Sequence, residues 1–215
     1  MVDAGHGHGH EHTGGHEHGH EGGHEHGHGG AGPLADASVR FARAADAPAV
    51  GFVQAVVFRD AYAAHLPAEA VEQFEPRPFT NAWRAALAEP PSRDHVLLVA
   101  CAGEQVVGFA AVAPSSDPDA GERTAELTTI AVHPDARRQG HGSRLLNAVV
   151  DTARGRGRDE LTTWVIGTDD DLRGFLTAAG LVPDGAHRGR VVSPEGETVR
   201  EVRLSADVSH DPRSA

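Results

Sequence analysis

The most informative stretch of the sequence is residues 130–146, which reads IAVHPDARRQGHGSRLL. It overlaps an apolar run that predicts a strand over Thr124–Val132, and it leads into apolar residues at helical spacing, which predict an amphipathic helix over Gly140–Arg154. The first amide groups of a helix lack internal acceptors and, together with the helix dipole, attract anions. Gly140 and Gly142 let a bulky anion approach the backbone. We therefore expect this loop to bind a pyrophosphate.

Other phosphate-binding motifs fit this stretch less well. A dinucleotide-binding fingerprint needs a third glycine, but Ser143, Arg144 and Leu145 follow the second one, and a Walker loop needs a lysine, which the chain lacks. A glycine-rich turn that only caps the helix is the plain alternative. Arg137 and Arg138 would add charge-assisted contacts to phosphate. His141, between the two glycines, is expected to face solvent.

The rest of the chain predicts one α+β (mixed α/β) domain. The expected order is a strand, helices, three strands, a helix, a strand, a helix and two strands. Pro76 and Pro78 are expected to interrupt the early helices, with helical spacing resuming over Asn81–Ala88. Thr168 is expected to cap the last helix, which would run to Ala179.

Residues 130–146 resemble the acetyl-CoA signature of the GNAT N-acetyltransferase superfamily, Gln/Arg-x-x-Gly-x-Gly/Ala. The resemblance implies the GNAT fold, in which helices flank a central, mostly antiparallel sheet. Its coverage gives a GNAT domain over 36–206 and a C-terminal tail over 207–215, and the low apolar content of residues 1–35 predicts a disordered His/Gly-rich tail there. Weaker similarity outside the signature involves Ala61–Pro67, Trp83-Arg84, Val106–Phe109 and Phe175–Leu181.

The resemblance also implies how acetyl-CoA would be held. Backbone groups of residues 130–132 would pair with the pantetheine arm, and amides from Arg138 to Ser143 would hold the pyrophosphate. An amine would then attack the thioester directly, without an acyl-enzyme. The implied cofactor-binding residues are Ile130, Ala131, Val132, Arg137, Arg138, Gln139, Gly140, His141, Gly142, Ser143 and Asp169.

Glu126 and Tyr62 are the candidate catalytic residues. A two-residue strand period would place Glu126 on the same face as Thr128, Ile130 and Val132, where the resemblance implies a general base. The alternative is a solvated or ion-paired carboxylate. The family often has a tyrosine acid where this chain has Leu176, so Tyr62, the only tyrosine, would replace that hydroxyl or else line the pocket.

Two further positions have plain interpretations. Asp169 matches a family asparagine at the helix start, so it would either contact CoA weakly or cap the helix. Cys101, the only cysteine, lies on a predicted strand and is expected to be an ordinary buried residue, which also excludes an internal disulfide.

The N-terminal residues form a histidine-rich repeat that holds ten of the sixteen histidines of the chain. Neutral imidazoles bind zinc, nickel, copper or cobalt, and the alternating glycines would let the chain wrap a metal ion. The alternative is a solubilising tail whose metal binding is incidental. The candidate metal ligands are His6, His8, His10, His12, His16, His18, His20, His24, His26 and His28.

Composition narrows the class of protein. The formal net charge of −12 argues against nucleic-acid binding, and the absence of long apolar runs argues against a membrane span. No secretory signal is visible, so we expect a cytoplasmic N-acetyltransferase. Its acceptor would be an amine on a small molecule or a protein, and a homodimer is compatible with the sequence. The alternative function is a metal-binding or acyl-CoA-sensing protein with a weakly catalytic GNAT domain.

Overall fold

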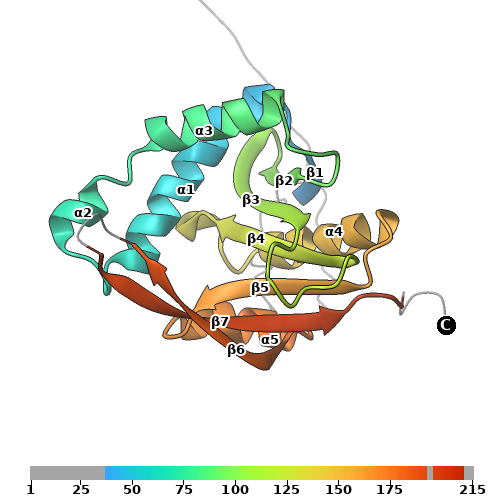
Figure 1. Cartoon of the computed structure of the whole chain (residues 1–215). Helices are drawn as coiled ribbons and strands as arrows, with labels where there is room; N and C mark the ends of the chain where they lie inside the picture. The colour runs from blue at the N-terminus through green and yellow to red at the C-terminus, as the bar shows by residue number, and fades with distance from the viewer. Residues whose placement is uncertain (1–36, 193–195, 211–215) are drawn as a thin grey trace, which may run out of the picture. The chain divides into compact units, whose positions relative to one another are not determined.

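A seven-stranded sheet forms the centre of the domain (Figure 1). The computed structural model describes residues 37–192 and 196–210, all within the unit Leu34–Ala215. The strand order is β1-β2-β3-β4-β5-β7-β6, and every neighbouring pair is antiparallel except β4 and β5. The described strands are β1 (Ala37–Phe41), β2 (Val96–Ala102), β3 (Gln105–Pro114), β4 (Thr124–Val132), β5 (Glu160–Ile166), β6 (Val182–Val191) and β7 (Thr198–Asp207).

Helices cover both faces of the sheet, as the sequence predicted for a mixed α/β domain. On one face, α1 and α3 pack against each other and α1 lies over β3 and β4; on the other, α4 packs against β1 to β4 (Figure 1). The described α-helices are α1 (Ala47–Tyr62), α2 (Ala68–Glu72), α3 (Pro76–Ala88), α4 (His141–Gly155) and α5 (Asp170–Ala178). Short 3-10 turns, η1 (Ala44–Asp46) and η2 (Pro134–Ala136), precede α1 and follow β4.

Two helix starts differ from the prediction. Pro76 and Pro78 do not interrupt a helix but lie in the first turn of α3, where the backbone amides have no intrahelical acceptor and the missing N–H of proline costs nothing. The cap of α5 is Asp169, whose carboxylate accepts from the Leu172 amide at 2.9 Å. Thr168, the predicted cap, instead hydrogen-bonds to His65 Nε2 at 3.1 Å.

Apolar side chains fill both faces of the sheet. Leu127, Leu145 and Leu176 belong to the larger cluster, which lies between the sheet and α4 and α5. Phe109 and Val53 belong to a second cluster beneath α1 and α3. The α4 and α5 side and the α1 side are therefore two separate compartments, and each strand residue can be assigned to one of them by its packing.

Candidate functional site

An open strand edge lies between β4 and β5. The two strands pair in parallel only from Thr124–Glu126 to Glu160–Thr162. Beyond that point the Thr163 hydroxyl donates to the Leu127 carbonyl at 2.8 Å, and no further residue of β5 pairs with β4 in the described ranges. Because β4 continues to Val132, its outer edge is free to hydrogen-bond to an extended ligand.

The pairing of β4 with β3 decides which backbone groups face this open edge. The His133 amide donates to the Val107 carbonyl at 2.9 Å, and Val132 lies opposite Gly108. Backbone groups of an antiparallel strand alternate between its two edges. Ile130 and Val132 therefore turn their N–H and C=O groups toward the open edge, whereas those of Ala131 turn toward β3.

The loop from β4 to α4 exposes a row of backbone amides. Arg138 and Gly140 adopt left-handed conformations, with φ of 63° and 82°. The first recorded backbone bond of α4 runs from the Arg144 amide to the Gly140 carbonyl at 3.1 Å. The amides from Arg138 to Ser143 consequently have no backbone acceptor among the described residues, and they coincide with the positive end of the α4 dipole. A row of free amides at a helix start is a geometry that can bind an anion.

The side chains of the loop have unequal roles. Arg137 is already engaged, since both of its terminal nitrogens lie 3.1 Å from Asp60 Oδ2 of α1. The Gln139 side chain donates to the Asp135 carbonyl at 3.1 Å. Arg138 is exposed and makes no recorded ion pair within the described residues. The Phe175 ring packs beside Gly142, where an added Cβ would lie 3.4 Å from it.

The expectation that His141 faces solvent is wrong. Only 2% of its surface is exposed, and its Nδ1 has no hydrogen-bond partner in the described part of the chain. Burial, with a smaller contribution from Arg144, lowers the pKa of His141. His141 is the first residue of α4, and it is buried together with Leu145 and Val149 of the same helix, which packs against the sheet.

The expectation that Glu126 shares a face with Thr128, Ile130 and Val132 is also wrong. Ala111 pairs with Thr129 and Val112 pairs with Leu127, so Thr128 is an extra residue in a β-bulge. A one-residue insertion reverses the alternation of side chains beyond it. Ile130 and Val132 pack into the cluster beneath α4 together with Leu127, and Glu126 therefore points to the opposite face.

On that face Glu126 is half-buried and makes no recorded hydrogen bond or ion pair within the described ranges. Burial raises the pKa of Glu126, and the negative charge of Asp117 raises it further. Arg188 and Arg190 act in the opposite direction, and Glu201 adds to the increase. A carboxylate with a raised pKa and an unused proton-acceptor site is suited to general-base chemistry near neutral pH.

The sequence did not reveal the charged network around Glu126. Asp117 accepts from Trp164 Nε1 at 3.0 Å and from Arg203 at 3.1 Å, and the Arg188 guanidinium lies 4.2 Å over the Trp164 ring. Glu201, only 2% exposed, accepts from Arg188 Nε at 2.7 Å. The signal available in the sequence was the alternation of charged and apolar residues over 201–204 (Glu, Val, Arg, Leu), which places Glu201 and Arg203 on one face of a strand.

Tyr62 lies at the end of α1 in an apolar cluster with Leu66, Ile166 and Val199. The rings of Phe58 and Phe74 pack against it at centroid distances of 5.6 Å. Burial raises the pKa of Tyr62, so the phenol keeps its proton at neutral pH.

Tyr62 and Glu126 share charged neighbours. Arg190 and Glu201 influence the pKa of both residues, and Tyr62 packs with Val199, two residues before Glu201 on β7. Leu176, at the position of the family tyrosine, is fully buried in the core beneath α4.

The predicted metal ligands, His6 to His28, lie outside the described residues. Within the described ranges, no group of three or more His, Cys, Asp or Glu side chains could hold a metal ion. No described helix is both long enough and apolar enough to cross a bilayer. Cys101 is buried and free, as expected.

Comparison with known sequences finds similarity to acetyltransferases. Residues 57–181 match the model of the acetyltransferase (GNAT) family. The chain is 33% identical over 120 residues to the mycothiol acetyltransferase of Rhodococcus erythropolis, and 37% identical over 90 residues to that of Saccharopolyspora erythraea. These alignments cover 50% and 42% of this chain but 36% and 25% of the relatives. The chain thus matches about a third or less of the length of these curated relatives.

Solved structures share the fold. The PaiA N-acetyltransferase of Thermoplasma acidophilum, solved with coenzyme A, superposes with a TM-score of 0.63 at 16% identity, covering 80% of this chain and 98% of that one. YncA from Salmonella typhimurium, solved with its cofactor acetyl-CoA, gives a TM-score of 0.58 at 18% identity, covering 82% and 96%. At these identities the likeness concerns architecture alone.

Proposed function

Because the chain belongs to the acetyltransferase (GNAT) family, we propose that it transfers the acetyl group of acetyl-CoA directly to the nitrogen of an amine. The observation that carries the proposal is the row of open amides from Arg138 to Ser143 next to the open edge of β4. The free amides fit a pyrophosphate, and the open edge of β4 fits an extended arm that carries amide groups. Acetyl-CoA contains both groups in that order.

The coenzyme would be held mainly by backbone groups. We assign the pantetheine arm to the open edge at Ile130 and Val132, with Ala131 keeping β4 in register on β3. We assign the pyrophosphate to the amides of Arg138, Gln139, Gly140, His141, Gly142 and Ser143. Arg138 would supply an exposed positive charge, whereas Arg137 and Asp169 would support the site by fixing the loop and the start of α5.

The position of Glu126 suggests the path of the reaction. The amides lie at the start of α4, which packs on one face of the sheet, while Glu126 points to the other face. The gap between β4 and β5 would connect the two, so that the thioester reaches the Glu126 side through it. The acceptor amine would approach from the side of α1 and β7.

Proton transfer would then involve two residues. The amine nitrogen forms a bond to the thioester carbonyl carbon, the carbon–sulfur bond breaks, and Glu126 takes the proton that the amine loses. Tyr62, protonated at neutral pH, would return a proton to the CoA thiolate. A Tyr62→Phe variant would lower kcat and leave the Kd of acetyl-CoA unchanged. If kcat is also unchanged, Tyr62 is a packing residue only.

The names of the relatives suggest which class of acceptor to test first. Two curated relatives are named mycothiol acetyltransferases, so amine-bearing small molecules are the first class to screen, with protein amines second.

The decisive experiment combines binding and turnover on the full chain. Calorimetry with CoA should show binding, and a thiol-release assay over an amine panel should show turnover. Glu126→Gln should retain CoA binding and lose about 10²-fold or more in kcat/KM. Absence of CoA binding would remove the proposed function. Retained activity in Glu126→Gln would remove Glu126 as the base.

We also propose that the N-terminal histidines bind divalent metal independently of acetyl transfer. The supporting observation is their number and alternate spacing, ten between His6 and His28. Calorimetry should show binding of Ni²⁺ or Zn²⁺, and removal of residues 1–32 should abolish it without changing kinetics. Altered kinetics would contradict that independence. CoA binding without turnover on any amine would favour the alternative, an acyl-CoA-sensing or metal-binding protein.

A further inference from the structure

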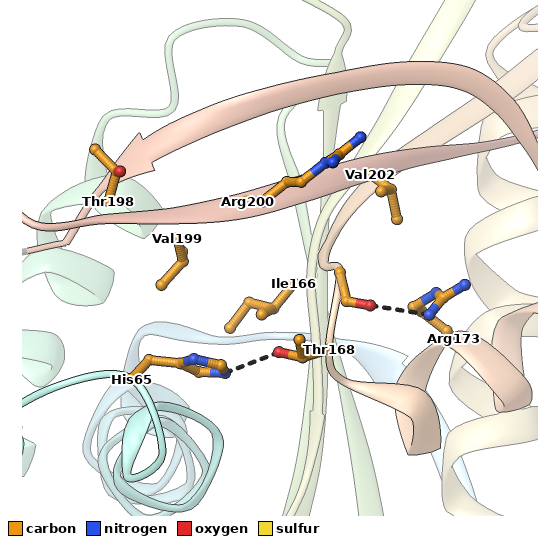
Figure 2. A pocket seen from close by; sticks show the side chains of 9 residues that line it. His65, Ile166, Thr168, Arg173, Thr198, Val199, Arg200 and Val202 are labelled. Carbon is orange, nitrogen blue, oxygen red and sulfur yellow. Dashed lines mark hydrogen bonds between the residues drawn. The ribbon is translucent and has the colours of Figure 1, made fainter.

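A pocket of about 430 Å³ lies where β5 ends (Figure 2). None of the residues assigned above to the coenzyme or to proton transfer lines it. His65, after α1, closes one side through its hydrogen bond to Thr168. The start of β7 and Arg173 of α5 form the opposite side.

The pocket is positively charged in an acidic protein. Two arginines, Arg173 and Arg200, are among its lining residues, and none of the described lining residues carries a carboxylate. The net charge of the whole chain is −12. This local reversal of sign would attract an anion and repel a cation.

Both arginines have unused hydrogen-bonding capacity. Arg173 donates from Nη1 to the Gly167 carbonyl at 2.9 Å and to the exposed Asp170, whereas its Nη2 makes no hydrogen bond in the described ranges. Arg200 is exposed and makes no recorded ion pair with a described residue. An anion in the pocket could accept hydrogen bonds from these free guanidinium groups.

The position of the pocket shows which part of a ligand it would hold. Ile166, in its wall, lies four residues beyond Thr162, the partner of Glu126 across the β4–β5 pair. Four residues of a strand span roughly 13 Å. An elongated acceptor could therefore reach both the pocket and Glu126.

We propose that this pocket binds an anionic group, a carboxylate or phosphate, at the end of the acceptor remote from its amine. The inference rests on the proposed acetyl transfer and deepens it, since it defines the acceptor as an amine that carries a distant negative charge. Arg200 would bind the anion directly, and Arg173 would complete the contact through its free Nη2.

Tetraglycine and tetraglycinamide provide a matched pair of probes, because they share the amine and differ only in the terminal charge. Calorimetry on the full chain, with and without CoA, should show that the acid binds about tenfold more tightly than the amide. Arg200→Gln and, separately, Arg173→Gln should abolish the preference. Arg77→Gln, which removes an exposed arginine of α3 outside the pocket, should preserve it.

Equal affinities for acid and amide, no binding of the acid, or a preference that survives Arg200→Gln would each overturn the inference. A second arm compares CoA with 3′-dephospho-CoA. If Arg200→Gln weakens only CoA, the pocket holds a coenzyme phosphate and the assignment to the acceptor is wrong. Failure of the proposed function would appear differently, as loss of CoA binding in the unmodified chain.

Discussion

Asp60 of α1 holds Arg137 of the phosphate loop, with both terminal guanidinium nitrogens 3.1 Å from one carboxylate oxygen. The Arg137 Nε also lies 3.3 Å from the Val132 carbonyl. The two adjacent arginines, Arg137 and Arg138, thus differ in their contacts. Arg137 holds the loop to β4 and α1. The guanidinium of Arg138 has no such partner among the described residues and is available to an anion.

This difference predicts unequal effects of two neighbouring substitutions. Arg138→Gln should weaken CoA binding about tenfold at low salt, and the loss should shrink as salt screens the charge. Arg137→Gln should change CoA affinity less, and it should cost no more than about 1 kcal/mol of stability because the pair with Asp60 is exposed. Calorimetry at two ionic strengths measures both. A larger effect of Arg137→Gln would show that the ion pair opens when the coenzyme binds.

The pH dependence of activity should respond to Asp117. Glu126 must be deprotonated to accept a proton, so kcat/KM should rise with pH through its pKa, which burial and Asp117 raise. Asp117→Asn removes one negative charge and should move the acidic limb of the profile to lower pH. The limb should vanish in Glu126→Gln. An unchanged limb in Asp117→Asn would mean that another group titrates there.

Packing between α1 and α3 should depend on Gly51. A Cβ there would lie 2.5 Å from Thr80 Oγ1, 2.6 Å from the Thr80 amide nitrogen and 2.9 Å from the Pro76 carbonyl. Because two of these atoms are backbone, Gly51→Ala should destabilise the domain by about 1–3 kcal/mol in urea unfolding. Gly174→Ala is the control, since Gly174 of α5 has open space around it. It should be neutral or stabilise by up to about 1 kcal/mol.

The free energy of unfolding should decrease as the pH falls, partly because of His141. Its folded-state pKa is lowered from the ordinary value of 6.5 by burial, so the unfolded chain binds a proton more readily than the folded one. Above pH 6.5 the imidazole is neutral in both the folded and the unfolded chain. As the pH falls below 6.5, the unfolded chain takes up the proton first, and the free energy of unfolding decreases. His141→Leu should therefore lose less unfolding free energy between pH 7.5 and pH 5 than the unmodified chain. Equal losses would show that His141 is hydrated.

Much of the phosphate loop could be predicted because its parts are consecutive. A strand, a short loop with two glycines and a helix start are adjacent in the sequence, and helix geometry alone leaves the first amides free. The order of strands and helices followed from periodicity for the same reason. The prediction of a helix break at Pro76 and Pro78 was wrong because prolines are compatible with the first turn of a helix as well as with a break.

Three features required the tertiary structure. The face of Glu126 depends on the bulge at Thr128, which exists only in the register between β3 and β4. The inward turn of His141 depends on the packing of α4 against the sheet. The network of Asp117, Arg188 and Glu201 joins a loop to two late strands, and no local pattern brings such distant residues together.

The sequence by itself therefore determined the strand, glycine-containing loop and helix start with their free amides, and the class of fold, because these follow from short-range backbone geometry and hydrophobic period. Only the tertiary structure decided which side of the sheet carries the candidate base, what charges surround it and where a second anion could lie. Those properties depend on strand register, where one inserted residue transfers a side chain from one compartment to the other.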